Sequence, residues 1–140
     1  MSRIFWDTNL FVYLLEDYGD LTKKTENLRA KMLARGDQLL TSTLTLGEIL
    51  VKPKREGRHE LCKMYEEILA ASALLLPLDV AAALVYATLR SDKTLKAPDA
   101  VQLACAASAS VDLFVTNDAR LQGKQISGIQ FIVPLERVPL

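Results

Sequence analysis

Four carboxylate side chains occur where polar groups interrupt the apolar segments of the chain. Asp7 ends one apolar run, Asp118 follows another, and Glu48 and Asp99 lie in the first turns of expected helices. Carboxylate oxygens are the ligands that hard divalent cations such as Mg²⁺ and Mn²⁺ prefer. Four carboxylates that converge without a cation repel one another, which raises the pKa of at least one of them. These residues therefore predict a metal site at which bound water becomes a nucleophile toward a phosphoryl group.

Each carboxylate also has a purely structural interpretation. Asp7 could cap the helix after it, Asp99 could complement a helix dipole, and Asp118 could close an Asx-turn. Glu48 could complete a capping box with Thr45, because the two have the Thr-x-x-Glu spacing. The conjunction of four carboxylates near connections that can share one sheet edge favours a common site, but both interpretations stay open.

The elements expected to position these carboxylates alternate between strands and helices. Nearly continuous apolar runs predict strands buried on both faces, over Arg3–Trp6, Gln38–Thr43, Leu74–Leu78, Leu113–Thr116 and Gln130–Val133. Helical patterns lie between them, over Leu10–Leu15, Leu21–Ala34, Leu46–Val51, Glu60–Ala71, Val80–Leu89 and Ala100–Ser108. We expect N-caps at Thr45 and Asp79 and a helix stop at Gly36. This order predicts an α/β fold whose parallel sheet binds ligands beyond the carboxyl ends of its strands.

The four carboxylates and their neighbours resemble the PIN-domain pattern. The segments that carry the resemblance are Asp7-Thr8-Asn9, Glu48, the run PDAVQLA from Pro98, and Thr116-Asn117-Asp118. In length and spacing the sequence is most similar to the VapC-type toxins of bacterial and archaeal toxin–antitoxin pairs, over essentially the whole chain. The resemblance implies a single PIN-like nuclease domain over residues 1–140. The implied fold has three layers, α/β/α, with a central, mostly parallel sheet of about five strands.

The same resemblance implies an activity and partners. It implies a Mg²⁺- or Mn²⁺-dependent endoribonuclease that cleaves RNA, acts as a homodimer and is silenced by a small antitoxin protein. The residues implied for catalysis and metal binding are Asp7, Glu48, Asp99 and Asp118. Their polar neighbours, which would help to order the site, are Asn9, Thr116 and Asn117.

Composition limits the other classes of protein. The 140 residues include 17 Lys and Arg against 17 Asp and Glu, and this zero net charge argues against general coating of nucleic acid. The two cysteines, Cys62 and Cys105, and a single histidine provide neither a disulfide framework nor a zinc site. No apolar run approaches the roughly 18 residues of a membrane span, and the N-terminus lacks the apolar stretch of a signal peptide. We therefore expect a cytoplasmic protein that does not contact membranes.

Two further segments have candidate roles. A basic stretch that contains Lys52, Lys54, Arg55 and Arg58 could contact RNA phosphates, or it could simply face solvent. The apolar segment Val80–Val85 is expected to be a core helix, with a dimer surface as the alternative.

Several functions are compatible with an acidic site of this kind. Cleavage of RNA is the leading hypothesis, and a housekeeping nuclease, a DNA-directed nuclease or a phosphatase could use the same residues. A non-catalytic binding module on the same fold would leave the retention of four carboxylates unexplained. Cleavage assays on matched RNA and DNA oligonucleotides separate the RNA-directed from the DNA-directed hypothesis.

Overall fold

In the computed structural model, which describes residues 1–140, five parallel strands form one sheet in the order β3-β2-β1-β4-β5. The strands are β1 (Arg3–Trp6), β2 (Gln38–Ser42), β3 (Leu74–Leu76), β4 (Val111–Val115) and β5 (Ile129–Val133). All five expected strands are confirmed, and the boundaries of β2, β3, β4 and β5 differ from the expected ones by one or two residues. Strand β3 ends before Pro77, which has no N–H to continue the ladder. Strand β4 begins two residues earlier than expected. The prediction starts only at Leu113 because the charged Asp112 interrupts the apolar run. In the structure the Asp112 carboxylate accepts a hydrogen bond from the Arg3 N–H at 2.7 Å.

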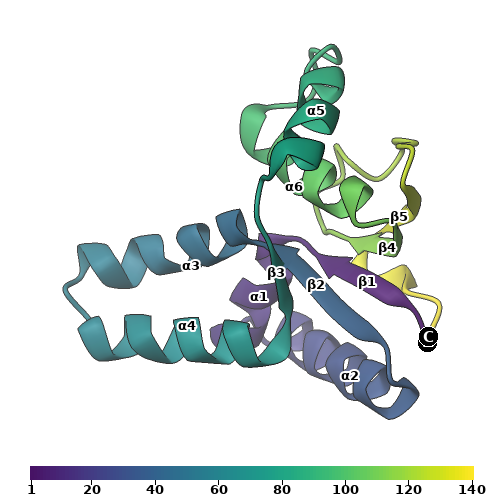
Figure 1. Cartoon of the computed structure of the whole chain (residues 1–140). Coiled ribbons are helices and arrows are strands. Elements are labelled where there is room, and N and C mark those ends of the chain that lie inside the picture. Colours follow the sequence, from purple (N-terminus) through teal and green to yellow (C-terminus); the bar gives the residue numbers. More distant parts are fainter.

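Six α-helices connect and cover the strands. They are α1 (Thr8–Leu15), α2 (Asp20–Arg35), α3 (Thr43–Arg55), α4 (His59–Ser72), α5 (Val80–Leu89) and α6 (Ala97–Ser108). Helices α1 and α2 lie on one face of the sheet, and α5 and α6 lie on the other (Figure 1). This arrangement confirms the expected three-layer α/β/α fold.

Alternation along the strands divides the core into two halves. Ile4 and Trp6 of β1 point into the half that α1 and α2 cover, where Trp6 contacts Phe11 with ring centroids 5.3 Å apart. Phe5 points into the opposite half and stacks on Phe114 of β4, with centroids 5.0 Å apart. Both faces of the central strands are therefore buried, as their nearly continuous apolar sequences predict.

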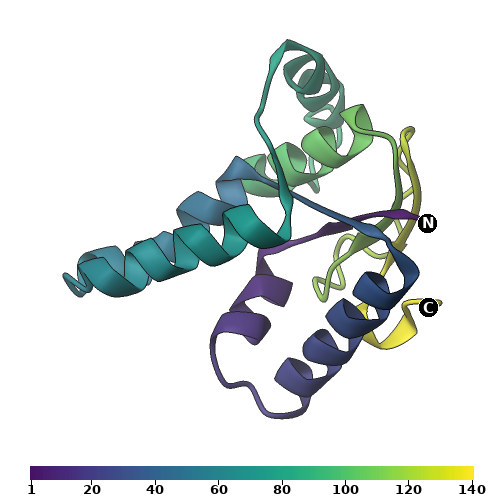
Figure 2. The ribbon, with the colours of Figure 1, turned by 60° about the horizontal axis from the view of Figure 1, so that its bottom comes forward.

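Helices α3 and α4 lie side by side and project away from the sheet (Figure 1, Figure 2). Their base is fixed to the core by Ile49 of α3 and by Tyr65 and Leu69 of α4, which are all buried. Beyond this base only Pro53 of α3 and Cys62 of α4 are buried, so the outer part of the pair forms an arm beside the carboxyl edge of the sheet. No helix of the structure combines the length and the apolar character needed to cross a bilayer.

The expected helix ends are confirmed in part. The Asp79 carboxylate caps α5 by accepting a hydrogen bond from the Ala82 N–H at 2.9 Å, and Gly36 ends α2 with φ +75°. The expected N-cap at Thr45 is wrong, because α3 begins at Thr43 and Ser42 is its cap. The Ser42 hydroxyl accepts the Thr45 N–H at 3.3 Å, which leaves the Thr45 hydroxyl free for contacts inside the protein.

The connection between β4 and β5 carries Asp118, and we predict that it depends on Gly128. Gly128 has φ +97°, and a Cβ atom there would lie 2.4 Å from the carbonyl oxygen of Ala107 in α6. Gly128→Ala should therefore lower the free energy of unfolding by about 2 kcal/mol or more, as a combination of backbone strain and overpacking does. Gly123→Ala is the matched control, since it lies in the same connection and nothing is within 4 Å of its Cβ position. Urea unfolding of both variants measures the difference, and equal effects would contradict this account of Gly128.

Candidate functional site

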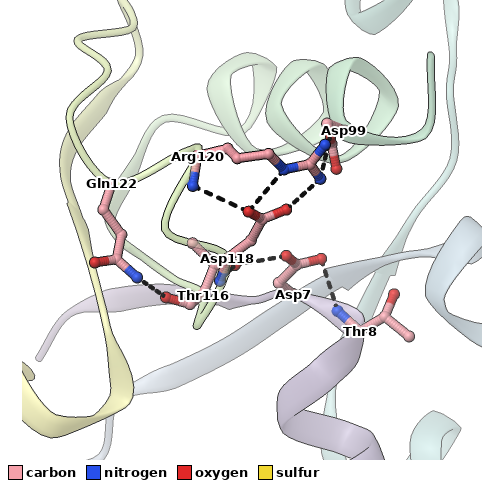
Figure 3. A network of polar contacts seen from close by, with 7 residues as sticks. All are labelled: Asp7, Thr8, Asp99, Thr116, Asp118, Arg120 and Gln122. Atoms are coloured by element: carbon pink, nitrogen blue, oxygen red, sulfur yellow. Dashed lines mark hydrogen bonds and ion pairs between the residues drawn. The ribbon is translucent and has the colours of Figure 1, made fainter. Parts of the chain in front are cut away.

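The structure places the four expected carboxylates at the carboxyl edge of the sheet. Asp7 directly follows β1, and Asp118 lies just beyond the end of β4, which is the neighbouring parallel strand. Asp99 lies in the first turn of α6, and Glu48 lies in the second turn of α3. The side chains of Asp7, Asp99 and Asp118 face the same region (Figure 3). The four charges interact electrostatically, Asp7 with Asp99 and Glu48, and Asp99 with Asp118.

Both oxygens of the Asp7 carboxylate accept hydrogen bonds. The Thr8 N–H donates to Oδ1 at 2.8 Å, so Asp7 is the N-cap of α1, and the Thr116 hydroxyl donates to Oδ2 at 2.7 Å. The cap interpretation of Asp7 is thus confirmed, and the cap is also the residue that faces the other carboxylates. Burial raises the pKa of Asp7, the two hydrogen bonds oppose that rise, and the charges of Asp99 and Glu48 add to it.

Asp118 has a different environment because Arg120 binds it. The Arg120 guanidinium donates to both Asp118 oxygens, from Nε at 3.0 Å and from Nη2 at 2.5 Å, and the Arg120 backbone N–H donates to Oδ1 at 3.0 Å. The backbone contact confirms the Asx-turn interpretation of Asp118. These hydrogen bonds from Arg120 lower the pKa of Asp118. The repulsion expected for converging carboxylates is therefore offset at this residue.

Asp99 is less well compensated than Asp118. Its closest cationic contact is Arg120 Nη2, which lies 3.3 Å from Asp99 Oδ2. Burial raises the pKa of Asp99, the charge of Asp118 raises it further, and Arg120 and Lys96 oppose the rise. The expectation that at least one carboxylate has a raised pKa is confirmed for Asp7 and Asp99, with burial as the larger cause in both.

The carboxylate oxygens of Asp99 and Asp118 already have a cationic group beside them, which is the guanidinium of Arg120. This guanidinium bridges Asp99 and Asp118 (Figure 3). With the side chains in this arrangement, no three His, Cys, Asp or Glu residues are grouped closely enough to hold a metal ion. The oxygen-only donor set fits Mg²⁺ or Mn²⁺ in chemical type, and such an ion would have to replace the guanidinium between these two carboxylates.

Glu48 is held by a single side-chain contact. The Thr8 hydroxyl donates to Glu48 Oε1 at 2.6 Å. The alternative in which Glu48 completes a capping box with Thr45 is wrong, because Ser42 rather than Thr45 caps α3. Glu48 is exposed, and its position on α3 places it at the base of the projecting arm.

The three expected supporting residues have different surroundings. Thr116 is fully buried and links the Asp7 carboxylate to the backbone of Asp118, because its hydroxyl donates to Asp7 and accepts the Asp118 N–H at 3.0 Å. The Asn117 amide oxygen accepts a hydrogen bond from the Leu135 N–H at 2.9 Å, so Asn117 anchors the C-terminal segment. The Asn9 amide oxygen is buried and has no hydrogen-bond partner. Of the three, only Thr116 therefore makes a hydrogen bond to a carboxylate.

The expected basic stretch lies toward the outer end of the α3–α4 arm. Lys52 pairs with Glu16 at 3.4 Å, and Arg58 pairs with Glu56 at 3.8 Å. Lys54 and Arg55 are exposed. At a rise of about 1.5 Å per residue, the stretch extends outward from the turn of α3 that carries Glu48.

The sequence prediction missed three residues of the site, Thr8, Gln102 and Arg120. Arg120 left a weak signal, since it is a cation two residues after an expected Asx-turn. Gln102 left another, because it is the one uncharged polar side chain between Val101 and Cys105 of a helix read as buried. The partners of Gln102 are 57, 60 and 94 residues away along the chain, and local sequence does not reveal contacts of that kind.

Comparisons with known proteins agree with this geometry. Residues 4–125 match the family described as PIN domain. The chain is similar in structure to VapBC2 from Rickettsia felis, with a TM-score of 0.74, 17% identity and coverage of 94% of this chain and 98% of that one. It is also similar to DNA-bound VapBC from Salmonella typhimurium, with a TM-score of 0.71, 19% identity and coverage of 96% and 99%.

A third similar structure is a toxin–antitoxin complex from Klebsiella pneumoniae, with a TM-score of 0.64, 21% identity and coverage of 90% of this chain and 94% of that one. At these identities the likeness concerns the fold. The comparison with curated protein sequences gives no match.

The opposite pKa shifts of Asp118 and Asp99 predict opposite effects on stability. Because the pKa of Asp118 is lowered by folding, its ionised form stabilises the protein near pH 7, and this contribution is lost as the pH falls through the folded pKa. Because the pKa of Asp99 is raised, its ionised form opposes folding near pH 7, and this penalty fades as the pH falls through the folded pKa. In EDTA near pH 7, Asp118→Asn should lower the melting temperature, and Asp99→Asn should leave it equal or higher.

Thermal unfolding followed by circular dichroism measures both variants against the wild type. Both differences from the wild type should shrink as the pH is lowered. Equal destabilisation by the two substitutions, at every pH, would contradict the environments described for these carboxylates.

Proposed function

The chain belongs to the PIN-domain family, and we propose that it is a metal-dependent endoribonuclease that acts as the toxin of a toxin–antitoxin pair. The observation that supports this proposal is the placement of Asp7, Glu48, Asp99 and Asp118 along the carboxyl edge of a parallel sheet. Ligands of α/β proteins bind at that edge. The proposed place of action is the cytoplasm, which is supported by two free, buried cysteines.

The residues proposed to hold Mg²⁺ or Mn²⁺ are Asp7, Asp99 and Asp118, with Glu48 as a further ligand or as the group that orients the attacking water. When bound, the ion supplies an activated water and neutralises charge on the phosphoryl group. Thr116 and the Thr8 N–H hold Asp7 in a fixed orientation. Arg120 is half exposed, so its guanidinium would be free to bind a phosphate oxygen once it leaves Asp118 and Asp99.

Contact with the RNA backbone is proposed for Lys52, Lys54, Arg55 and Arg58. These cations lie on the arm that starts at Glu48 and extends away from the sheet. The ion pairs of Lys52 and Arg58 are exposed and weak, so an RNA phosphate can compete for them. A local basic arm on a chain of zero net charge supports binding of a short segment of RNA rather than general coating.

A small antitoxin is the proposed protein partner. A cleft of about 120 Å³ lies between α1, α3 and α4, beside Glu48. Its lining combines apolar side chains with charges of both signs, namely Val12, Leu15, Ile49, Leu61 and Tyr65 with Glu16, Lys52, Glu56 and Arg58. A peptide segment with apolar anchor residues could dock there and cover the acidic site. The similar structure from Klebsiella pneumoniae is itself a toxin–antitoxin complex.

A homodimer is proposed on the basis of α5. Only Ala82 of this helix is fully buried, so the expectation that Val80–Val85 is a core helix is wrong. The reason is that α5 packs chiefly on α6, which leaves its outer surface free. Val80 is 78% exposed and Leu84 is 69% exposed, and burial of such side chains against a second copy would be favourable.

The proposed activity predicts metal-dependent cleavage of single-stranded RNA by the purified protein. Cleavage should require Mg²⁺ or Mn²⁺ and should stop with EDTA. Asp7→Asn and Asp99→Asn should each reduce the cleavage rate by at least about two orders of magnitude, as expected when a group that acts in the transition state is removed. Gel analysis of labelled RNA, with a DNA oligonucleotide of the same sequence as the control, measures this. Preferential cleavage of the DNA would favour the DNA-directed alternative, and undiminished cleavage by either folded variant would exclude the assigned site.

The proposed dimer predicts that the wild-type protein sediments as a dimer at tens of micromolar. Leu84→Lys should shift it to the monomer, because a charge at an apolar contact is costly to bury. Leu33→Lys is the matched control, since Leu33 is 62% exposed on α2, on the opposite face of the sheet. A wild-type monomer, or dissociation caused equally by both substitutions, would argue against an α5 interface.

A further inference from the structure

A series of hydrogen bonds leads from the interior of the protein to Glu48, and it starts at Gln102. Gln102 lies on α6, one turn after Asp99, and is 3% exposed. Its amide oxygen accepts a short hydrogen bond from the Ser42 hydroxyl. Its amide nitrogen donates to the hydroxyl oxygens of Thr8 at 3.0 Å and Thr45 at 2.8 Å. Every polar atom of this buried amide therefore has a partner.

The orientation of the Gln102 amide determines the direction of these hydrogen bonds. The Ser42 hydroxyl accepts the Thr45 N–H at 3.3 Å, so its own hydrogen is available for the Gln102 oxygen. With the oxygen facing Ser42, the two N–H groups must face Thr8 and Thr45. The reverse orientation would turn the amide oxygen toward Thr8 and would take up the hydrogen of the Thr8 hydroxyl.

The hydrogen bond from Gln102 to Thr8 determines that the Thr8 hydroxyl donates onward to Glu48. A hydroxyl group has one hydrogen, and because Thr8 accepts from Gln102, that hydrogen is free for another acceptor. The available acceptors are Glu48 Oε1 at 2.6 Å and the Thr45 hydroxyl at 3.2 Å. The shorter contact, to a charged carboxylate, is the stronger one. The result is a directed path from Ser42 through Gln102 and Thr8 to Glu48.

We propose that Gln102 and Thr8 are positioning residues that hold the Glu48 carboxylate in one rotamer beside Asp7. Glu48 is exposed, and no other hydrogen bond or ion pair restrains its side chain. A long exposed side chain loses rotamer freedom only where a contact holds it. Gln102 is buried by the packing of α6, so the path ties an exposed carboxylate to a fixed point of the core. This inference rests on the proposed function, in which Glu48 acts on the metal or on the attacking water.

The competing account is that the same polar network only joins α1, β2, α3 and α6. Two isosteric substitutions separate these accounts, because Thr8→Val and Thr45→Val each remove one acceptor of the Gln102 amide. Thr45 is fully buried and also contacts Thr41, at 2.8 Å. If the network is purely structural, Thr45→Val should therefore lower stability and kcat at least as much as Thr8→Val does. Only Thr8 contacts Glu48, so a positioning role should be lost with Thr8→Val alone.

The test measures kcat and KM on a single-stranded RNA oligonucleotide with saturating Mn²⁺, together with thermal unfolding. Thr8→Val should lower kcat by about 10- to 100-fold, as loss of an outer hydrogen bond to a site ligand does, and should leave KM unchanged. Thr45→Val should lower the melting temperature and leave kcat close to that of the wild type, because Thr45 makes no contact with Glu48. Thr8→Ser retains the hydroxyl and should restore wild-type kcat. Equal losses of kcat in the two Val variants would overturn the inference.

A double substitution tests whether Gln102 acts through Thr8. If it does, adding Gln102→Leu to Thr8→Val should lower kcat no further, because the path is already broken. A further large loss of kcat in a double variant that folds like the single one would overturn this step. If Gln102→Leu does not fold, the comparison of Thr8→Val with Thr45→Val still decides the role of Thr8.

A measurement without substrate separates failure of this inference from failure of the proposed function. In metal-free protein with ¹³C-labelled glutamate, side-chain couplings should give Glu48 a single rotamer in the wild type and in Thr45→Val, and averaged rotamers in Thr8→Val. Averaged rotamers in the wild type would overturn the inference even if RNA is cleaved. A single wild-type rotamer that is lost in Thr8→Val would support it even if RNA is not the substrate.

Discussion

Negative charge gathered at one edge of a parallel sheet is the constraint on which the rest of the site depends. The topology brings the ends of β1 and β4 and the first turns of α3 and α6 to the same edge, so four carboxylates lie along it and interact electrostatically. Different contacts offset the negative charge at each of these residues. Asp7 is held by hydrogen bonds from Thr116 and the Thr8 N–H, and Asp118 is neutralised by Arg120. Asp99 shares that arginine at a longer distance and retains a raised pKa. The pKa values of Asp7 and Asp99 therefore stay raised, and perturbed pKa values of this kind are common at functional sites.

The same constraint explains why polar side chains lie inside the protein just behind this edge. Thr41, Ser42, Thr45 and Gln102 are all buried, in a region where the flanking helices would otherwise present apolar side chains. Each has a hydrogen-bond partner, so their burial does not leave the desolvation penalty of an unpaired group. A fully satisfied polar cluster is costly to rearrange and holds its members in one geometry. Burying these polar side chains costs desolvation energy, but the hydrogen bonds that offset this cost also fix the helices and strands at the carboxyl edge of the sheet.

Much of this arrangement could be predicted from the sequence. The five apolar runs predict the strands, and the parallel sheet that they imply places Asp7 and Asp118 at one edge. What local sequence did not show was which partner each polar group would choose. Thr45 has the spacing of a helix cap, yet Ser42 takes that role because α3 begins three residues earlier than expected. Asn117 lies beside Asp118 in the motif, but its side chain binds the Leu135 N–H instead. Such choices depend on contacts between residues far apart in the chain, and neither periodicity nor propensity encodes them.

The contacts of the site also differ in how easily another ion or water can replace them. The inner contacts are buried hydrogen bonds, and the outer contacts are exposed ion pairs. The inner side of the site consists of Thr116 and Gln102, which are at most 3% exposed and whose positions follow from core packing. Its outer side consists of Asp99 and Asp118 under the half-exposed guanidinium of Arg120. A buried hydrogen bond cannot be replaced by water, whereas an exposed ion pair is replaced readily by another ion or a phosphate. An added ion therefore competes more easily for the ion pairs of Arg120 than for the buried hydrogen bonds behind them. The Asp7 carboxylate is oriented from the interior by the fully buried hydroxyl of Thr116.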